Sequence, residues 1–309
     1  MDRKKKEKKI QTILSSVAIL VIAIIATLFS GIEEDFKIEN TKVVHTITAE
    51  ESENIVLEGE NHLQIHFFDV GQADSIFLIQ KGKSMLIDAG NNEDGDWIVQ
   101  QIKRLGIQKI DYLIGTHPHE DHIGGMDDVI QNFEIGTIYM PKVQTNTKTF
   151  EDVLDAILEK NMTVTTPTIG HKFNVGEVEC EVMLCGSGTK EEQKNLNLSS
   201  LVIRANYGEQ SYLFMGDSEK ENEKLRSWPQ TNVLKVGHHG SDTSSGETFL
   251  TQVLPQLAII QVGEGNSYGH PKQATLDKLK KIGTLVYRTD EKGNIVIESD
   301  GKKNKVSFY

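Results

Sequence analysis

The interpretation of this sequence rests on one stretch of six residues, His117-Pro118-His119-Glu120-Asp121-His122. It closely follows residues 110–114, a short apolar run that is typical of a buried strand. Because His117 and His119 are two positions apart in an extended loop, their rings project to the same side and can share one metal ion. Asp121 and His122 then turn toward a second position. Imidazole and carboxylate ligands suit zinc, manganese or iron, so the stretch predicts a centre for two divalent metal ions, with zinc preferred and manganese as the alternative.

The surrounding sequence predicts an α+β domain over residues 63–309. Strand-like apolar runs occupy residues 63–68, 75–79, 84–87, 110–114, 178–184, 201–205, 212–215, 232–236, 257–261, 284–287 and 294–298. Amphipathic helical patterns occupy residues 97–105, 150–158 and 274–282. Two runs of strands with helices between them indicate two sheets that pack face to face and are covered by helices.

The first sixty residues differ from the rest. A basic cluster over residues 1–9 is followed by an uncharged, largely apolar run over residues 10–32. As a helix this run would span roughly 34 Å, enough to cross a hydrocarbon layer of about 30 Å. We expect a cytoplasmic tail (1–9), one transmembrane anchor (10–32) and an acidic linker (33–62) that holds the domain outside the cell. A cleaved signal peptide, which would make the protein secreted, is the open alternative.

The composition narrows the class of partner. The formal net charge of the chain is −12. Such acidity argues against a broad nucleic-acid surface, because those surfaces are basic. The two cysteines, Cys180 and Cys185, are too few for a disulfide framework, and their odd spacing places them on opposite faces of a strand. We therefore expect both thiols to be unpaired.

Five further motifs accompany the histidine stretch: Phe67-Phe68-Asp69-Val70-Gly71-Gln72-Ala73-Asp74-Ser75, Leu86-Ile87-Asp88-Ala89-Gly90, Phe214-Met215-Gly216-Asp217, Leu234-Lys235-Val236-Gly237-His238-His239-Gly240-Ser241 and Tyr268-Gly269-His270-Pro271. Together with the H-x-H-x-D-H signature, they resemble the metallo-β-lactamase superfamily. Within it they are most similar to the extracellular hydrolase domain of ComEC-type competence proteins, which serve DNA uptake. The phosphocholine esterases of bacterial surfaces are a related branch. The resemblance implies an αββα sandwich with two metal ions at one edge, between the sheets.

The resemblance also assigns the remaining metal ligands. Asp217, which follows a strand through Gly216, is implied as the carboxylate that bridges both metals. His238 is implied to complete the second metal. Adjacent side chains at the end of a strand point oppositely, so His239 is expected to support the site or to contact substrate instead.

One ligand of the usual superfamily set has no clear counterpart here. Many members carry another histidine between the signature stretch and the bridging aspartate, and it completes the first metal. Only His171 occupies this interval, in a setting typical of a turn. The ComEC-like branch has an Asn/Ser segment in this region, and Asn197 and Ser200 match it as candidate contacts to metal or substrate. We therefore expect the first metal to be held more weakly, or only with substrate present.

Four other roles follow from position and resemblance. Asp88 closes a strand and is implied to orient the histidine loop through hydrogen bonds. Asp69 lies in the loop after the first strand and could face substrate. His270 is a candidate general acid, or a phosphate contact, because histidine titrates near neutral pH. Asp121 is expected to position the attacking water as well as to bind metal.

The sequence therefore favours a membrane-anchored, extracellular, metal-dependent hydrolase of a phosphoester, most simply a phosphodiester. DNA, cell-surface phosphocholine and a small phosphodiester are the candidate substrates. Hydrolysis of a C–N or thioester bond, as in other superfamily branches, is the enzymatic alternative. A non-catalytic module that assists DNA uptake is the alternative without turnover.

Overall fold

The computed structural model describes residues 62–309. The predicted cytoplasmic tail (1–9) and anchor (10–32) lie outside the described residues, as does the predicted linker (33–62) apart from His62. Among the helices of residues 62–309, none combines the length and apolarity that a membrane crossing requires.

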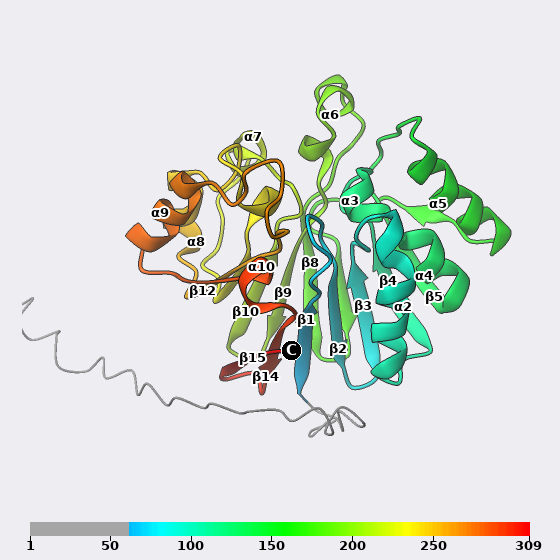
Figure 1. Ribbon diagram of the computed structural model, residues 1–309, viewed down its shortest axis with the longest axis horizontal. Coiled ribbons are helices and arrows are strands. Elements are labelled where there is room, and N and C mark those ends of the chain that lie inside the picture. Colours follow the sequence, from blue (N-terminus) through cyan, green and yellow to red (C-terminus); the bar gives the residue numbers. More distant parts are fainter. Residues whose placement is uncertain (1–61) are drawn as a thin grey trace, which may run out of the picture. The chain divides into compact units, whose positions relative to one another are not determined.

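The described residues form two β-sheets that lie side by side in Figure 1. The first has the strand order β15 (Asn304–Phe308), β14 (Ile295–Ser299), β1 (Leu63–Phe67), β2 (Ile76–Gln80), β3 (Lys83–Ile87), β4 (Lys109–Ile114), β5 (Glu134–Tyr139) and β6 (Val164–Thr165). Pairing is antiparallel from β15 to β3 and parallel from β3 to β6.

The second sheet has the strand order β13 (Leu285–Arg288), β12 (Leu257–Ile260), β11 (Val233–Lys235), β10 (Gln210–Phe214), β9 (Val202–Tyr207), β8 (Val178–Leu184) and β7 (Lys172–Val175). Its strands β10 to β13 are parallel, and β7 to β10 pair antiparallel. Both sheets therefore combine parallel and antiparallel pairs.

The two sheets pack against each other because their strands alternate apolar side chains between two faces. In β2, Leu78 belongs to the core between the sheets, whereas Phe77 faces the helices outside. In β10, Tyr212 and Phe214 face the first sheet and Leu213 faces outward. The central core thus contains buried residues of both sheets, such as those of β1 and β12.

Helices cover the outer faces of both sheets. The first sheet is covered by α2 (Gly95–Arg104), α4 (Met126–Asn132) and α5 (Lys148–Glu159), and the second by α8 (Glu247–Val253) and α9 (Gln273–Lys281). Short helical turns lie in the connections: η1 (Asn92–Asp94), α3 (Glu120–Ile123), α6 (Lys190–Lys194), η2 (Leu196–Ser199), α7 (Lys220–Glu223), η3 (Gly237–Gly240) and α10 (Thr289–Lys292). The predicted α+β fold with two facing sheets inside helical layers is confirmed.

The order of the strands brings the predicted motifs to one edge. Asp88 follows β3, His117 follows β4, Asp217 follows β10, and η3 follows β11. These strands of each sheet run parallel, so their carboxyl ends open at a common edge. In Figure 1 this edge is the upper one, where α3 and α7 are labelled. The predicted free thiols are also present, since neither Cys180 nor Cys185 forms a disulfide.

Candidate metal centre

The histidine stretch forms the loop between β4 and α3. His119 is the N-terminal cap residue of α3, and its carbonyl accepts hydrogen bonds from the backbone N–H groups of His122 and Ile123 at 3.2 and 3.0 Å. This helical turn carries Asp121 and His122 toward the space between the sheets. The rings of His117 and His122 are fully buried, and their centroids are 4.2 Å apart.

Four side chains converge at this place: Asp121, His122, Asp217 and His239. Each offers one ligand atom, and these atoms all lie within 4.8 Å of one another. His122 Nε2 is 3.3 Å from Asp217 Oδ1, and His239 Nε2 is 3.3 Å from Asp121 Oδ2. Among buried atoms, His122 Nε2, His239 Nε2 and Asp217 Oδ1 have no hydrogen-bond partner. Unpartnered nitrogen and oxygen atoms that face one point are the donor set of a divalent cation, so these residues fit a metal ion.

Hydrogen bonds at the other ring nitrogens orient the lone pairs toward this point. His239 Nδ1 lies 3.0 Å from the Gln261 carbonyl oxygen, which can only accept, so Nδ1 carries the proton. His122 Nδ1 lies 2.7 Å from Asp88 Oδ2 and donates in the same way. When either ring is neutral, its Nε2 therefore presents a lone pair to the cluster.

Asp88 joins the histidine loop to β3. Its carboxylate accepts hydrogen bonds from the backbone N–H and the hydroxyl of Thr116, both at 2.8 Å, and from His122. This geometry corresponds to the orienting role expected of Asp88. The backbone of Asp88 is left-handed, with φ of 60°, and so are His238 and His239, with φ of 50° and 49°. Non-glycine residues in this region are strained, and such strain gathers at functional sites.

The two adjacent histidines differ from the prediction. His239, expected in a supporting role, is buried and belongs to the four-residue cluster, whereas His238, expected on the second metal, does not. The prediction assumed that side chains continue to alternate between the two faces of β11 through His238 and His239. Instead the chain turns as η3, and the left-handed backbone of both residues redirects their rings. The structure therefore places His239, and not His238, among the four side chains that could hold a metal ion, which differs from the predicted ligand set.

His117, His119 and His238 lie on the other side of Asp217. His117 Nε2 is 2.9 Å from His119 Nδ1 and 4.0 Å from Asp217 Oδ2. His238 Nε2 lies 3.6 Å from the same carboxylate oxygen. Asp217 thus faces the four-residue cluster with Oδ1 and the second histidine group with Oδ2.

The charges of the cluster also suit a cation. Burial alone would lower the pKa of His239, but the carboxylates of Asp217 and Asp74 outweigh it and raise this pKa to about 10. Burial would raise the pKa of Asp217, yet His122 and His239 hold it well below its usual range. By contrast, burial and then neighbouring His122 hold the pKa of His117 well below its usual value, so its ring is neutral. Against the effect of burial, Asp217 and Asp88 likewise raise the pKa of His122 well above its usual value. Protons on His122 and His239 then offset the carboxylates, and a divalent ion could take their place.

Comparison with known proteins identifies the family. The model of the family described as metallo-β-lactamase superfamily matches residues 68–264, which is more than half of the chain. This chain belongs to the metallo-β-lactamase superfamily. The matched residues include the loops that follow β3, β4, β10 and β11. They also include every member of the four-residue cluster.

Three similar curated proteins carry names from competence and recombination. ComE operon protein 3 of Bacillus subtilis (strain 168) is 31% identical over 269 residues, which are 80% of this chain and 34% of that protein. Recombination protein 2 of Haemophilus influenzae is 28% identical, over 75% of this chain and 28% of that protein. Competence protein ComA of Neisseria gonorrhoeae is 27% identical, over 76% of this chain and 32% of that protein. The predicted resemblance is confirmed, and the chain spans about a third of the length of these relatives.

Solved structures share the superfamily fold at low identity. The metallo-β-lactamase fold protein YhfI from Bacillus subtilis has a TM-score of 0.53 at 11% identity, and covers 77% of this chain and 100% of that one. A variant of the β-hydroxylase CmlA has a TM-score of 0.50 at 11% identity, over 77% of this chain and 54% of that one. These likenesses concern the fold alone, so the reaction has to be inferred from the site.

The Asn/Ser segment packs against the second histidine group. Leu201 N–H donates to the Thr116 carbonyl at 2.8 Å, which fixes the segment to the histidine loop. Asn197 Nδ2 lies 3.4 Å from the ring nitrogens of His238, and Asn197 Oδ1 and Ser200 Oγ are buried atoms without a partner. Asn197 therefore lies beside the second histidine group, in contact with His238.

His270 lies at the rim of the centre, with its ring centroid 5.6 Å from that of His238. Burial, followed by the nearby His238 and His239, lowers the pKa of His270 to about 4. Its ring is consequently neutral near pH 7. His171, the residue in the interval of the missing ligand, instead lies 2.9 Å from the Tyr139 hydroxyl and is outside the cluster.

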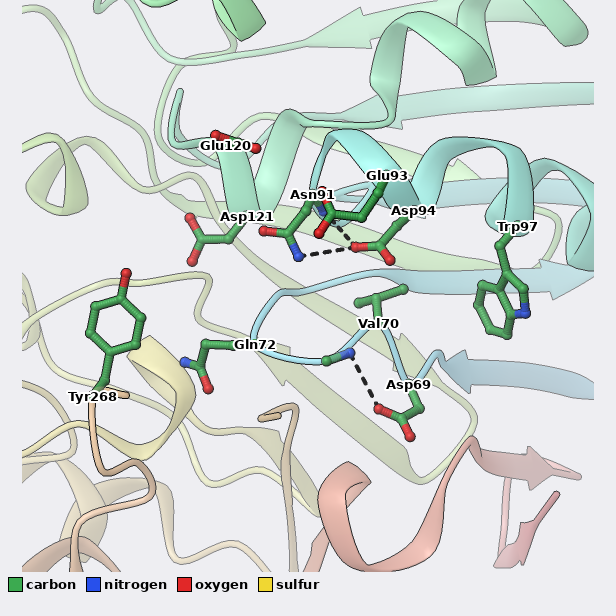
Figure 2. A pocket seen from close by; sticks show the side chains of 11 residues that line it. Asp69, Val70, Gln72, Asn91, Glu93, Asp94, Trp97, Glu120, Asp121 and Tyr268 are labelled. Atoms are coloured by element: carbon green, nitrogen blue, oxygen red, sulfur yellow. Dashed lines mark hydrogen bonds between the residues drawn. The ribbon is translucent and has the colours of Figure 1, made fainter. Parts of the chain in front are cut away.

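A cleft of about 770 Å³ opens beside Asp121. Figure 2 shows Asp121 and Tyr268 on one side of it and Trp97 at the other end. Its carboxylates are Asp69, Glu93, Asp94, Glu120 and Asp121, and no lysine or arginine of the described residues lines it. Asp69, predicted to face substrate, therefore lines a cleft that adjoins the metal centre.

Sequence reasoning missed several supporting residues. Gln261 and Glu219 are buried and contact His239 and His238, respectively. The buried Lys235 contacts Asp74, and none of these three residues received a role. A signal was available for Lys235, because a lysine within the apolar run 232–236 is expected to have a buried partner. No comparable signal marks Gln261, whose contact uses its backbone carbonyl.

Proposed function

We propose that this chain is a metal-dependent phosphoester hydrolase with two metal positions that share Asp217. The observation that carries the proposal is the convergence of His122 Nε2, His239 Nε2 and Asp217 Oδ1, buried and without hydrogen-bond partners. With Asp121, these atoms would hold the second metal. His117, His119 and Asp217 Oδ2 would hold the first, and His238 Nε2 is near enough to that oxygen to join them.

Two divalent ions held by these residues would supply a bound water with a pKa lowered toward neutrality and would stabilise charge that develops on phosphoryl oxygens. Two side chains would position the reacting groups. Asp121, on the cleft side of the cluster, orients the water. His270 has a neutral ring on the rim, so it can donate one N–H to a phosphoryl or leaving oxygen. Zinc is the proposed metal, with manganese as the alternative for a site of imidazole and carboxylate ligands.

The cleft bears on the class of substrate. A long polyanion would meet the carboxylates that line the cleft, and no described lysine or arginine lines it to compensate. A small phosphodiester, or phosphocholine on a cell-surface polymer, would place only one phosphate at the metals. DNA remains a candidate because the curated relatives include competence proteins. We favour a phosphodiester with a small alcohol group.

A substrate panel tests the reaction class. The full chain, purified in detergent and supplied with Zn²⁺ or Mn²⁺, would be assayed with bis(4-nitrophenyl) phosphate, a chromogenic β-lactam and a thioester. We expect chelator-sensitive turnover of the phosphodiester and little of the others. Preferential turnover of the β-lactam or thioester would favour the alternative hydrolase. Absence of all turnover in a metal-loaded protein would favour a non-catalytic accessory module.

We further propose that residues 10–32 anchor the chain in the cell membrane with the hydrolase domain outside. The basic residues at 1–9 and the uncharged run that follows support this orientation. Protease added to intact cells would then degrade the domain and leave a cytoplasmic control protein intact. Protection of the domain until the cells are lysed would contradict the proposal.

A further inference from the structure

Lys235 is the one lysine or arginine that is buried within residues 62–309. Its ammonium Nζ donates to Asp74 Oδ2 at 2.6 Å and to the Val236 carbonyl at 3.0 Å. Asp74 lies in the loop before β2 of the first sheet and Lys235 ends β11 of the second, so the pair joins the sheets. Buried ion pairs often contribute little net stability, because removing both charges from water offsets their attraction.

Asp74 contacts three members of the four-residue cluster. Its Oδ1 lies 3.3 Å from His239 Nδ1, and its Oδ2 lies 4.0 Å from His122 Nδ1. Its backbone N–H donates to the Asp121 carbonyl at 3.0 Å. Asp74 thus lies next to the ligand atoms without lining the cleft.

The ring of His239 depends on such support. Its backbone has a φ of 49°, which L-residues rarely adopt, so the main chain alone does not favour this placement. Its Nδ1 is held between the Gln261 carbonyl and Asp74 Oδ1. Lys235 fixes the Asp74 carboxylate by binding Oδ2, which leaves Oδ1 to face the ring. The ion pair therefore fixes one of the two groups that face His239 Nδ1.

We propose that Lys235 and Asp74 are positioning residues that hold His239 on the second metal position. In this arrangement Asp74 acts through His239, and Lys235 acts through Asp74. The inference rests on the proposed metal centre, because its effect is exerted on a metal ligand. It predicts that the pair controls metal affinity rather than the stability of the fold.

The test compares Mn²⁺ binding with thermal unfolding in the same preparations of the full chain. In one variant, Asp74→Leu combined with Lys235→Met, apolar side chains of similar size replace both charges. In a second, Asp74→Asn keeps the shape and removes the carboxylate. The matched control is Tyr212→Phe, which removes the 2.7 Å hydrogen bond from Tyr212 to Asn304 between the same two sheets, away from the cluster.

We expect the double variant to unfold near the wild-type temperature, because apolar replacement of a buried pair is often neutral or stabilising. One of its two positions should nevertheless bind Mn²⁺ about 10- to 100-fold more weakly, the usual effect of losing a residue that supports a ligand. The control should retain wild-type affinity whatever its unfolding temperature.

Wild-type affinity at both positions in the double variant would overturn the inference. If the double variant does not fold, Asp74→Asn decides in the same way: weaker binding supports the inference and unchanged binding overturns it. A wild-type chain that binds no Mn²⁺ would overturn the proposed function as well, whereas two ions bound with the same affinities in the wild type and in the variants would overturn this inference alone.

Discussion

At the scale of single residues, His238 and His239 are neighbours in sequence that face different parts of the centre. His239 is buried with its Nε2 among Asp121, His122 and Asp217, whereas His238 is partly exposed and supported by Thr243, whose hydroxyl lies 2.9 Å from its Nδ1. Alanine variants at these two adjacent positions can therefore be compared as a matched pair.

We expect His239→Ala to weaken binding of one metal by about 100-fold or more, since even residues that support a ligand contribute about 10- to 100-fold. We expect His238→Ala to retain that metal and to lower turnover through the other position. Isothermal titration with Zn²⁺ would measure the first effect and phosphodiester hydrolysis the second. Loss of the tighter metal in His238→Ala, with its retention in His239→Ala, would reverse the assignment.

Asp88 provides a second prediction at this scale. Its carboxylate holds both His122 Nδ1 and the Thr116 N–H, so it sets the orientation of the whole loop. Asp88→Asn should weaken metal binding by about 10- to 100-fold, because an amide cannot accept from both groups as a carboxylate does. A titration that matches the wild type would show that the loop holds its shape without this charge.

At the scale of elements, close packing of glycines places α3 and α4 against the loop that follows β3. A Cβ on Gly124 would lie 2.2 Å from the Asn91 carbonyl carbon, and one on Gly125 would lie 2.5 Å from Gly95 Cα. Both glycines also donate backbone hydrogen bonds to this loop, to Gly90 and Ala89 respectively. The backbone contact explains why Gly124 and Gly125 follow the histidine stretch.

Gly124→Ala should therefore destabilise the protein by about 1–3 kcal/mol or more, the usual cost of overpacking, because the clash is with backbone. Urea denaturation of the full chain would measure it. The control is Gly82→Asn in the hairpin between β2 and β3, where no atom lies within 4 Å of an added Cβ and asparagine tolerates the positive φ. Equal stabilities of the two variants would contradict the packing argument.

The elements also show what the sequence could and could not predict. Strongly patterned segments were found: the helix expected over residues 97–105 is α2, and that over 150–158 is α5. The strand β5 was missed because Gly136 and polar neighbours interrupt its apolar pattern, yet it pairs in parallel with β4. The helix α8 was missed because its threonines, phenylalanine and valine favour strands locally, and packing on the second sheet overrides them.

The candidate site was predictable wherever the spacing of residues along the chain fixes the direction in which their side chains project. The H-x-H-x-D-H stretch and Asp217 lie together, as their positions at strand ends indicated. The orientations of His238 and His239 were not predictable, because they depend on left-handed backbone that no residue type at these positions signals. The contact between Lys235 and Asp74 was equally hidden, since it joins residues 161 positions apart.

At the scale of the whole molecule, the metal-free protein should lose stability as the pH rises. The pKa of His239 is raised from its usual value near 6.5 to about 10, so its contribution is fully present below about pH 6.5. That contribution is lost as the pH rises through about 10, because the folded protein then gives up the proton. Bound metal replaces the proton, so the loaded protein should lack this dependence.

Thermal unfolding of the full chain between pH 6 and about 10, with chelator and then with Zn²⁺, would measure this effect. The unfolding temperature should fall with pH only in chelator, and His239→Gln should reduce the slope. A chelated protein whose stability rises over this range would contradict the charge distribution described for the cluster.

The most direct measurement of the central claim is the metal content of the purified full chain after dialysis against Zn²⁺ or Mn²⁺, in the wild type and in Asp217→Ala. Since Asp217 faces both positions, we predict about two metal ions per chain in the wild type and fewer than one in the variant, with phosphodiester hydrolysis lost in parallel. A wild-type chain with fewer than one metal ion, or an Asp217→Ala variant that keeps both, would contradict the proposal of a shared two-metal centre.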